Sequence, residues 1–469
     1  MLRRRLEQEQ GFGMALVVLV GAMLTLMGVI MIEQVRGESN RSVHQVYGGT
    51  SYQAAEAGID DYVAKLVDDR LYYLHYVHPG EATRQDSGGS TVAAGAAWTF
   101  GQAWTYPNGK DTWRALPNGY EYNLRVYPPD ATSQYVRVIA AGRRTGETLD
   151  ARVLEVWVRP SSLADYYRVV NGDVGWGPGA ITNGKIYANG DIDHDGIATA
   201  NIYAEGQIGG SVVMQSPGPG EPVPQRYDVD TSPDDIRDKI PNPIDFTSFL
   251  TSFTDIERAS QLDGIYLNDA SKHAWRLSFK SNGTIDIETC MRVGVADVAD
   301  VVPTCTFFDN RPVPANGAVY VVQDAIVQNA PTSGGVKGRV TVASNDDIIV
   351  ANDISYVTAG QDVLGLVAKN YVYIAKYTPD PLTWSAGVIA QTGTWQARPW
   401  NVPADGPSKK SLMTFRGMAA TDDGGSFTGM FTNRDYGYDE NFLWLPPPWF
   451  PVVEDAYTVL FFRELPAAT

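Results

Sequence analysis

The sequence predicts an α+β protein in which a long N-terminal helix packs on an antiparallel sheet and a large β-solenoid domain is inserted into that sheet. Three observations lead to this class. Residues 12–70 contain no proline, and apolar residues recur in their second half at three- and four-residue steps. Three segments of alternating apolar and polar residues follow. Beyond them the chain changes to short repeats rich in Gly, Asn and Asp.

The predicted helix begins with 21 uncharged residues, 12–32. About 20 apolar residues are enough to cross a bilayer, and Arg3, Arg4 and Arg5 favour a cytoplasmic N-terminus. A cleaved signal peptide is the alternative, but its apolar core is only about 7–15 residues long and ends at a small-residue cleavage site. We therefore expect a chain that a single N-terminal helix anchors in the membrane.

A short basic leader that ends in Gly11 and Phe12, the uncharged half-helix and the "AAEAGI" of residues 54–59 resemble the N-terminus of type IV prepilins. The sequence is most similar to the PilX-type minor pilins. The resemblance implies that a prepilin peptidase cuts between Gly11 and Phe12 and methylates Phe12. It also implies other pilins as partners, a stay in the plasma membrane before assembly, and a final place outside the cell in a pilus.

One position departs from the major pilins, which carry glutamate at the fifth residue after the cut. Leu16 stands there. A carboxylate without a partner is costly in lipid, so a subunit with no neighbour ahead of it does better without one. Leu16 therefore fits a subunit at the filament tip, and also a pilin-like protein that never joins a filament.

Short β-solenoid repeats are predicted after residue 165, with an irregular β-sandwich as the alternative. Branched aliphatic residues are separated there by four to six positions, with turn residues between them. They are Ile181, Ile186, Ile192, Ile197, Ile202, Ile208 and Val212. The segment 456–465 is apolar on both faces, so we expect it to return and cover the exposed edge of the antiparallel sheet.

The predicted organisation has five parts. They are a leader (1–11), a helix (12–70), an antiparallel sheet (71–164), an inserted solenoid-like domain (165–440) and a returning strap and strand (441–469). Within the sheet, the alternating segments are 119–128, 134–144 and 150–160. The end of the chain also resembles the endings of large bacterial envelope proteins that combine a PilX-like start with a solenoid body.

Candidate site residues are few. Cys290 and Cys305 form an even pair, which in a domain outside the cell predicts a disulfide that stabilises the fold by about 3 kcal/mol. Asp191, Asp193 and Asp195 precede Gly196 and match the opening of a calcium loop. Ile202 stands where that loop needs its glutamate, and Asp and Gly are also ordinary solenoid corners, so both interpretations stay open. No other cofactor is expected.

One stretch combines cations with aromatic residues, as binding of single-stranded nucleic acid requires. Its residues are Trp395, Arg398, Trp400, Lys409, Lys410 and Arg416. A loop with its aromatic residues packed inward is the alternative, and the net charge of −17 argues against a general nucleic-acid surface.

The sequence therefore favours a minor pilin, at the tip of a type IV pilus or a related filament, that presents a solenoid for adhesion or ligand capture. A DNA-binding tip pilin for DNA uptake is the first alternative. A membrane-anchored solenoid enzyme that acts on polysaccharide is the second. No common catalytic motif is present, so we expect no enzyme.

Overall fold

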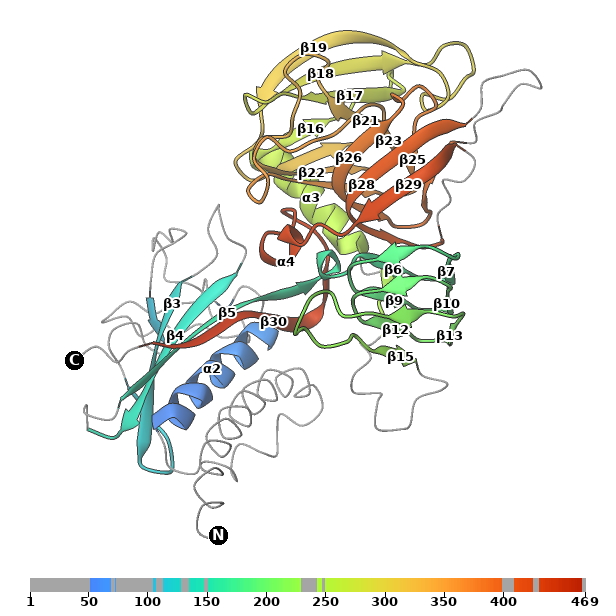
Figure 1. The fold of residues 1–469 in the computed structure, drawn as a ribbon. Helices are drawn as coiled ribbons and strands as arrows, with labels where there is room; N and C mark the ends of the chain where they lie inside the picture. Colours follow the sequence, from blue (N-terminus) through green and yellow to red (C-terminus); the bar gives the residue numbers. More distant parts are fainter. Residues whose placement is uncertain are drawn as a thin grey trace.

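The computed structural model consists of two connected parts, which we call the head and the solenoid (Figure 1). The head comprises α2, β1 to β5 and β30, and the solenoid comprises β6 to β29 with α3. The predicted cleavage site, Gly11 and Phe12, lies outside the described residues. The structure describes residues 51–68, 72, 104–106, 113–127, 135–146, 151–228, 243–246, 249–398, 409–424 and 430–465.

The head is an antiparallel sheet with α2 (Ser51–Asp68) packed on one face. Its strands follow the order β1-β3-β4-β5-β30, and β2 pairs with β3. Their bounds are β1 (Trp104–Tyr106), β2 (Arg114–Ala115), β3 (Tyr120–Tyr127), β4 (Val136–Arg144), β5 (Arg152–Ser162) and β30 (Val452–Leu465). The three alternating segments of the sequence thus become β3, β4 and β5.

Side-chain periodicity decides which faces of α2 and the sheet meet. The residues of α2 that enter the core lie three or four positions apart, on one side of the helix. They are Ala55, Ile59, Tyr62 and Leu66. A glycine permits the closest contact, because a Cβ on Gly142 would lie 2.1 Å from the carbonyl oxygen of Ser51. A larger side chain at Gly142 would therefore push the helix off the sheet.

The last strand closes the head. β30 pairs antiparallel with β5, so that Val459 lies opposite Val158 and Arg463 opposite Glu155. The sequence predicts this return for residues 456–465, and the pairing is present. The chain therefore leaves the head through β5 and comes back through the neighbouring strand, with the whole solenoid between them.

The first section of the solenoid is small and three-sided. Each turn of the chain adds one strand to each of three parallel columns. The columns are β6 (Arg168–Val170), β9 (Ile186–Ala188), β12 (Ile202–Ala204) and β15 (Arg226–Asp228), then β7 (Val174–Trp176), β10 (Ile192–His194) and β13 (Ile208–Gly209), then β8 (Ile181–Thr182), β11 (Ile197–Ala198) and β14 (Val213–Met214). Ile186 is buried as the repeat predicts, but Ile181 is 60% exposed because the third column buries Thr182 and Ala198 instead.

The second section of the solenoid is wider and has two main sheets. One contains β16 (Ile265–Leu267), β20 (Ala318–Val321), β22 (Arg339–Ser344), β24 (Val363–Ala368), β26 (Leu382–Ala390), β28 (Lys410–Thr421) and β29 (Phe431–Gly437). The other contains β17 (Ala274–Phe279), β18 (Thr284–Met291), β19 (Thr304–Pro312), β21 (Asp324–Asn329), β23 (Ile348–Val350), β25 (Val372–Ile374) and β27 (Trp395–Ala397). The neighbours are parallel, except that β17, β18 and β19 pair antiparallel.

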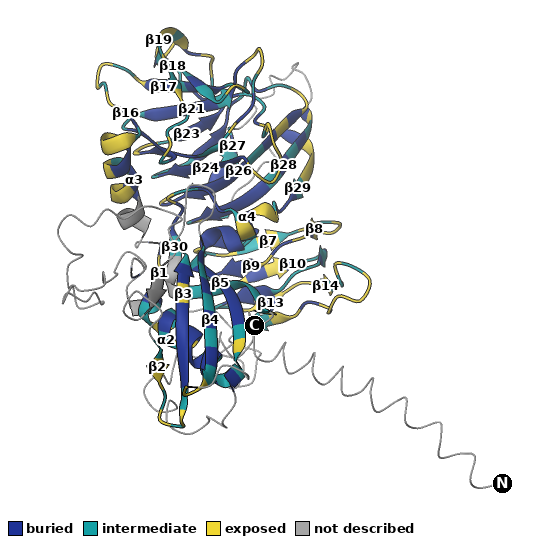
Figure 2. Cartoon of the chain, turned by 90° about the vertical axis from the view of Figure 1, so that its left-hand side faces the viewer, coloured by how far each residue is buried: buried dark blue, intermediate teal, exposed yellow. Residues whose placement is uncertain are grey.

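The two sections share one continuous sheet, because β28 of the second section pairs parallel with β6 of the first. Helix α3 (Phe249–Asp263) packs against this sheet through Phe253 and Ile256. Figure 2 shows α3 with one buried and one exposed side, whereas the strands beside it are mostly buried. The solenoid is therefore a stack of coils with a packed interior.

The predicted α+β class is wrong. The described residues form mainly strands, and the α-helices among them are the short α2, α3 and α4 (Asn441–Trp444), with no long N-terminal helix. The reason is the size of the solenoid, which consists almost entirely of strands and turns and outweighs the one helix of the head. The described fold is therefore mostly β.

The expected single-helix membrane anchor also needs correction. In the part of the chain that the structure describes, every helix is too short or too polar to cross a membrane. Residues 12–32, on which the expectation was based, lie outside that part. The described structure therefore gives the single-helix anchor no support.

Candidate functional site

Two of the predicted calcium residues, Asp191 and Asp195, lie at corners of the first solenoid section. Asp191 Oδ1 accepts a hydrogen bond of 2.8 Å from the backbone N–H of Gln207 in the next coil. Asp195 Oδ1 accepts hydrogen bonds of 3.0 Å from both the backbone N–H and the hydroxyl of Ser211, and these bonds lower the pKa of Asp195. Asp193 is exposed on β10, and the three carboxylates do not converge within 4.8 Å of one another.

The same corner bond recurs through both sections. A carboxylate of one coil accepts from a backbone N–H of the next coil, which ties successive coils together. The pairs are Asp173 with Asp191, Asp347 with Tyr371, Asp353 with Thr383 and Asp380 with Ser411. The Asp- and Gly-rich rhythm of the sequence therefore has a structural use in the solenoid, apart from any metal.

The predicted nucleic-acid residues are spread between the core and paired surface positions. Trp395 is buried among aromatic rings, and Arg398 forms an ion pair of 2.6 Å with Asp297. The ammonium group of Lys410 donates to the backbone carbonyl and hydroxyl of Thr378, and burial lowers its pKa to about 8. Arg416 pairs with Asp435 at 2.7 Å. Lys409 is exposed, and Trp400 lies outside the described residues.

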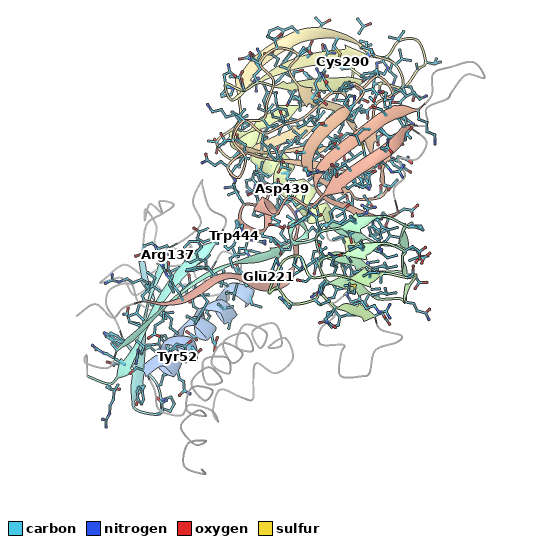
Figure 3. All side chains as sticks on the ribbon, in the orientation of Figure 1. Tyr52, Arg137, Glu221, Cys290, Asp439 and Trp444 are labelled. Atoms are coloured by element: carbon cyan, nitrogen blue, oxygen red, sulfur yellow. A yellow bond between two sulfur atoms is a disulfide. The ribbon has the colours of Figure 1, made fainter. Side chains whose placement is uncertain are left out.

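Cys290 and Cys305 form a disulfide between β18 and β19, with their Cα atoms 4.1 Å apart. In Figure 3, Cys290 lies at the end of the solenoid that is farthest from the head. The bond closes the loop between the two strands, so it fixes the outermost hairpin of the molecule.

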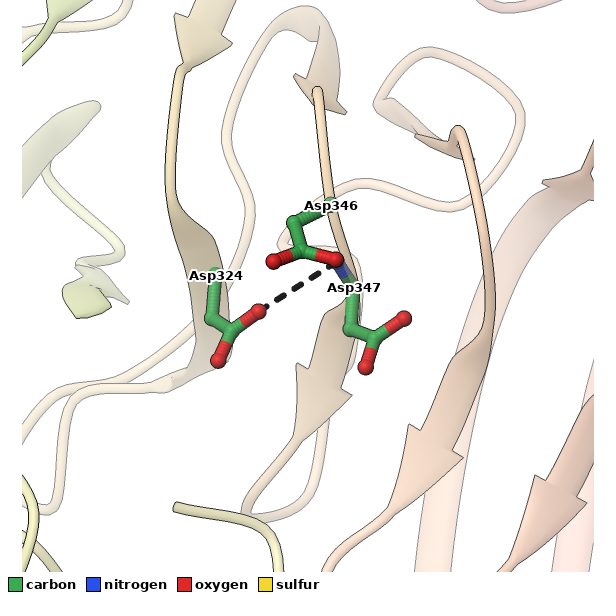
Figure 4. Close-up of side chains that lie close together, drawn as sticks. All are labelled: Asp324, Asp346 and Asp347. Carbon is green, nitrogen blue, oxygen red and sulfur yellow. Dashed lines mark hydrogen bonds between the residues drawn. The ribbon is translucent and has the colours of Figure 1, made fainter. Parts of the chain in front are cut away.

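Three carboxylates gather on the second solenoid section and form what we call the acidic trio, Asp324, Asp346 and Asp347. One ligand oxygen from each lies within 4.8 Å of the others, and the backbone N–H of Asp347 donates to Asp324 (Figure 4). Burial, followed by the neighbouring Asp346 and Asp347 charges, raises the pKa of Asp324 to about 7.

Carboxylate oxygens at this spacing are the donors that a hard cation such as calcium takes. In the acidic trio, however, Asp346 also accepts from the side-chain amide of Asn370, and Asp347 from the backbone N–H of Tyr371. These are corner bonds of the solenoid, and Arg292 lies 3.8 Å from Asp324. The geometry is explained by the fold, and we assign no ion to it.

A further surface, which the sequence reasoning missed, covers the side of the head sheet opposite α2. We call it the arginine–aromatic face. Its residues occupy the outward positions of β3, β4, β5 and β30, as the strand registers show. They are Arg125, Tyr127, Arg137, Arg143, Glu155, Trp157, Phe461 and Arg463. The alternation of the three meander segments could have located this face, because Arg and aromatic residues stand there where polar residues usually face water.

Glu155 lies at the centre of the arginine–aromatic face and is completely buried. It accepts hydrogen bonds from Arg137, from Arg463 at 2.6 Å and from the indole N–H of Trp157 at 2.9 Å. Burial raises the pKa of Glu155, but the three hydrogen bonds outweigh burial, and the pKa is lowered overall. One carboxylate thus orients two guanidinium groups, each of which keeps further N–H donors.

The rings of the arginine–aromatic face stack on one another. Tyr135 lies parallel to Trp157 at 4.6 Å, and Trp157 packs on Phe461 at 4.8 Å. Arg137 covers the ring of Tyr127 and Arg463 covers that of Phe461. Each of these rings therefore packs on at least one other side chain of the head.

Comparison with known proteins gives little beyond the structure itself. No protein-family model matches the sequence, and no curated protein does. Among solved structures, the chain is similar to the competence-associated pilin ComZ from Thermus thermophilus, at 12% sequence identity over 88% of this chain and 96% of that chain. The TM-score of this match is 0.29, which is too low to establish a common fold.

Proposed function

We propose that this chain is a filament subunit of the minor-pilin kind, in which the head joins other subunits and the solenoid is held out for ligand capture. The pairing of β5 with β30 carries the proposal. The solenoid is inserted between these two strands, so the head holds both of its ends. A load on the solenoid is then transmitted through strand hydrogen bonds rather than through a single flexible tether.

The joint between the two parts supports this role. The guanidinium of Arg159 is buried, pairs with Asp165 and donates to the backbone carbonyl of Leu443 at 3.1 Å. The backbone N–H of Ser162 donates to the carboxylate of Asp165 in a capping box, and the hydroxyl of Ser162 donates to the backbone carbonyl of Pro451. The outgoing and returning segments are therefore bonded to each other where they leave the sheet.

The arginine–aromatic face is the surface that we assign to contacts with neighbouring subunits. Tyr, Trp and Arg are the residues that dominate binding energy at protein interfaces. Here they are pre-ordered by the buried Glu155, so little conformational entropy is lost when a partner binds.

DNA uptake is the finer version of the proposal, and it has less support. Of the six residues predicted for DNA binding, Trp395 is part of the core, and Arg398 and Arg416 are ion-paired to aspartates. Non-specific DNA binding requires cationic side chains that can neutralise DNA phosphates and so release their counterions. We therefore propose that the solenoid captures its ligand for adhesion. We propose neither nucleic acid nor an enzymatic substrate as that ligand.

N-terminal processing in the natural host tests the proposal. We expect the mature chain to begin at Phe12, and Gly11→Val to leave the leader attached, because the peptidase must accept a residue without a side chain there. Gly13→Val is the matched control and should be processed normally. Mass spectrometry of the N-terminal peptide reads the result, and immunogold labelling should place the chain on filaments. An intact Met1, or a cut beyond Ile32, would overturn the assignment.

A further inference from the structure

The solenoid ends in an open strand edge. β19 is the terminal strand of its seven-stranded sheet, and among the described strands it pairs only with β18. All nine of its residues are at least partly exposed. Figures 1 and 2 both place β19 at the end of the molecule opposite the head. Such an edge offers backbone N–H and C=O groups to a strand from another molecule.

Exposed apolar side chains gather at this edge. The described residues include fourteen large hydrophobic residues that are exposed, and seven of them belong to β19, the end of β18 or the loop between the two strands. They are Met291, Val293, Val295, Val301, Val302, Phe307 and Phe308. Phe307 is 62% exposed in the middle of β19. A concentration of this kind marks a contact surface rather than scattered surface residues.

The edge is also held in a defined shape. The disulfide ties Cys305 of β19 to Cys290 of β18. Near the other end of the strand, the side-chain amide of Asn310 donates to Asp286 at 2.6 Å. The backbone N–H of Val313 donates to Gly283, and hydrogen-bonded pairs alternate along an antiparallel ladder, so the N–H of Asn310 points away from β18. It donates to the carboxylate of the adjacent Asp309, at 2.8 Å. This N–H therefore belongs to the open side of the strand and is available to a pairing strand once Asp309 finds another partner.

The charges on β19 indicate which strand can pair with its open edge. Asp309 and Arg311 are ion-paired at 2.7 Å, and each side chain is 42% exposed. In an antiparallel pair of two β19 strands centred on Asn310, Asp309 of each copy lies opposite Arg311 of the other. Opposite charges in directly facing positions stabilise a strand pair, and like charges destabilise it.

We propose that two copies of this chain associate through their β19 edges, as an antiparallel two-fold pair centred on Asn310. A shift of the centre to Asp309 or to Arg311 would place two like charges opposite each other, so the charge pattern disfavours these two neighbouring registers. The exposed phenylalanines Phe307 and Phe308 flank the charged centre and lose water contact on pairing. The contact joins the outer ends of two solenoids, and it leaves both heads free for their own filaments.

Charge exchange tests the proposal on the purified full chain. Sedimentation velocity should show a monomer–dimer equilibrium for the unchanged chain. Asp309→Arg alone and Arg311→Asp alone should each weaken it by about tenfold or more, because each creates two like-charged pairs per dimer. The double exchange Asp309→Arg with Arg311→Asp restores complementarity and should restore the dimer. Circular dichroism and thermal melting should confirm that each variant is folded.

Several results would overturn the proposal. They are a monomer at every concentration, single variants that associate like the unchanged chain, a double exchange that does not recover, and oligomers that grow beyond a dimer. The register has a test of its own. Asn310→Cys should form an intermolecular disulfide under mild oxidation, because the two residues face each other at the centre. Asn345→Cys, exposed elsewhere on the solenoid, is the matched control, and equal cross-linking of the two variants would contradict the register.

Discussion

A buried carboxylate in the head and one in the solenoid have pKa values that are shifted in opposite directions. Glu155 is surrounded by donors from β4, β5 and β30, and its pKa is lowered. Asp324 is buried beside two other carboxylates, and burial followed by their charges raises its pKa to about 7. The first therefore stabilises the fold when it is ionised, whereas the second does so when it is protonated.

The two parts differ in the same way in what holds them together. The head joins segments from distant parts of the chain, since Arg463 and Glu155 are 308 positions apart. Within each of its two sections, the solenoid joins neighbouring coils, as in the bond from Gln207 to Asp191 across 16 positions. Loss of one element should therefore affect the whole head but only a few coils of the solenoid. Deletions and single substitutions in each part can test this difference.

Removal of residues 452–469 should have the largest effect. The deletion uncovers the edge of β5, removes Arg463 from Glu155 and takes three partly buried residues, Tyr457, Val459 and Phe462, from the core of the head. We expect amides of β3, β4 and β5 to lose most of their protection in hydrogen exchange, while β22, β24 and β26 keep theirs. Removal of residues 466–469 alone is the control. Unchanged protection in the head would refute the closing role of β30.

Glu155→Gln should destabilise the head by about 3 kcal/mol, because it breaks a buried ion pair. This value is at the low end for such pairs, since Arg137 and Arg463 both reach solvent. Glu464→Gln, which removes only an exposed pair with Arg152, should cost about 1 kcal/mol or less. Denaturant unfolding that is followed by a probe in the head provides the comparison. Equal losses for the two variants would argue against the central role of Glu155.

The pH dependence of this effect has a definite sign. The folded pKa of Glu155 is lowered, so its stabilisation is fully present above the ordinary value of 4.5 and is lost as the pH falls through the folded pKa. The head of the unchanged chain should therefore lose stability in acid, and Glu155→Gln should show a smaller acid-dependent loss. If both proteins lose the same stability between neutral and acidic pH, Glu155 is not the group responsible.

Local patterns predicted the strands well. The alternating residues of β3, β4 and β5 could be read directly, because alternation has a period of two. β30 could be recognised from its apolar residues on both faces, although residues 457–465 are half-buried or exposed because β30 is itself the last strand of the sheet. The fold class could not be predicted in this way. It depends on the head and the solenoid taken together, and the solenoid, predicted over 165–440, supplies most of the strands. The pairing of β28 with β6, in which Ala419 meets Arg168 across a long stretch of sequence, is also not visible in any local pattern.

The contacts of the site residues could be predicted less well than the strands. For Asp191, Asp193 and Asp195, the sequence left a calcium loop and solenoid corners as open alternatives. Asp193 lies on β10 and only the other two are corner residues, and whether carboxylates converge on an ion depends on the direction in which each one points. Arg398 and Arg416 looked like free cations because Asp297 and Asp435, their partners, lie on other strands or loops. The outward residues of β3, β4 and β5 could have located the arginine–aromatic face. Its centre could not be predicted from them, because Glu155 gains Arg463 and Trp157 gains Phe461 only when β30 returns to the sheet.

Asp324→Asn should have a moderate effect of the opposite sign to Glu155→Gln. The folded pKa of Asp324 lies above its ordinary value of 3.8, so the carboxylate costs stability as the pH rises from about 4 to about 7. The amide removes this cost, and the variant should be more stable than the unchanged chain at pH 8, by on the order of 1 kcal/mol. Asp263→Asn, an exposed control, should change little. A variant that is less stable at pH 8 would refute the prediction.

Asp191→Ala should have the smallest and most local effect. It removes the acceptor of one corner bond, which stabilises the fold by about 1 kcal/mol, and it leaves the backbone of β10 intact. Because coils contact only their neighbours, hydrogen exchange should accelerate at Gln207 and in β13, whereas α2 and β3 to β5 should be unaffected. Glu221→Ala, which removes an exposed carboxylate from the same section, is the matched control. Faster exchange throughout the head would show that the two parts unfold together. It would contradict the expectation that a loss in the solenoid affects only the neighbouring coils.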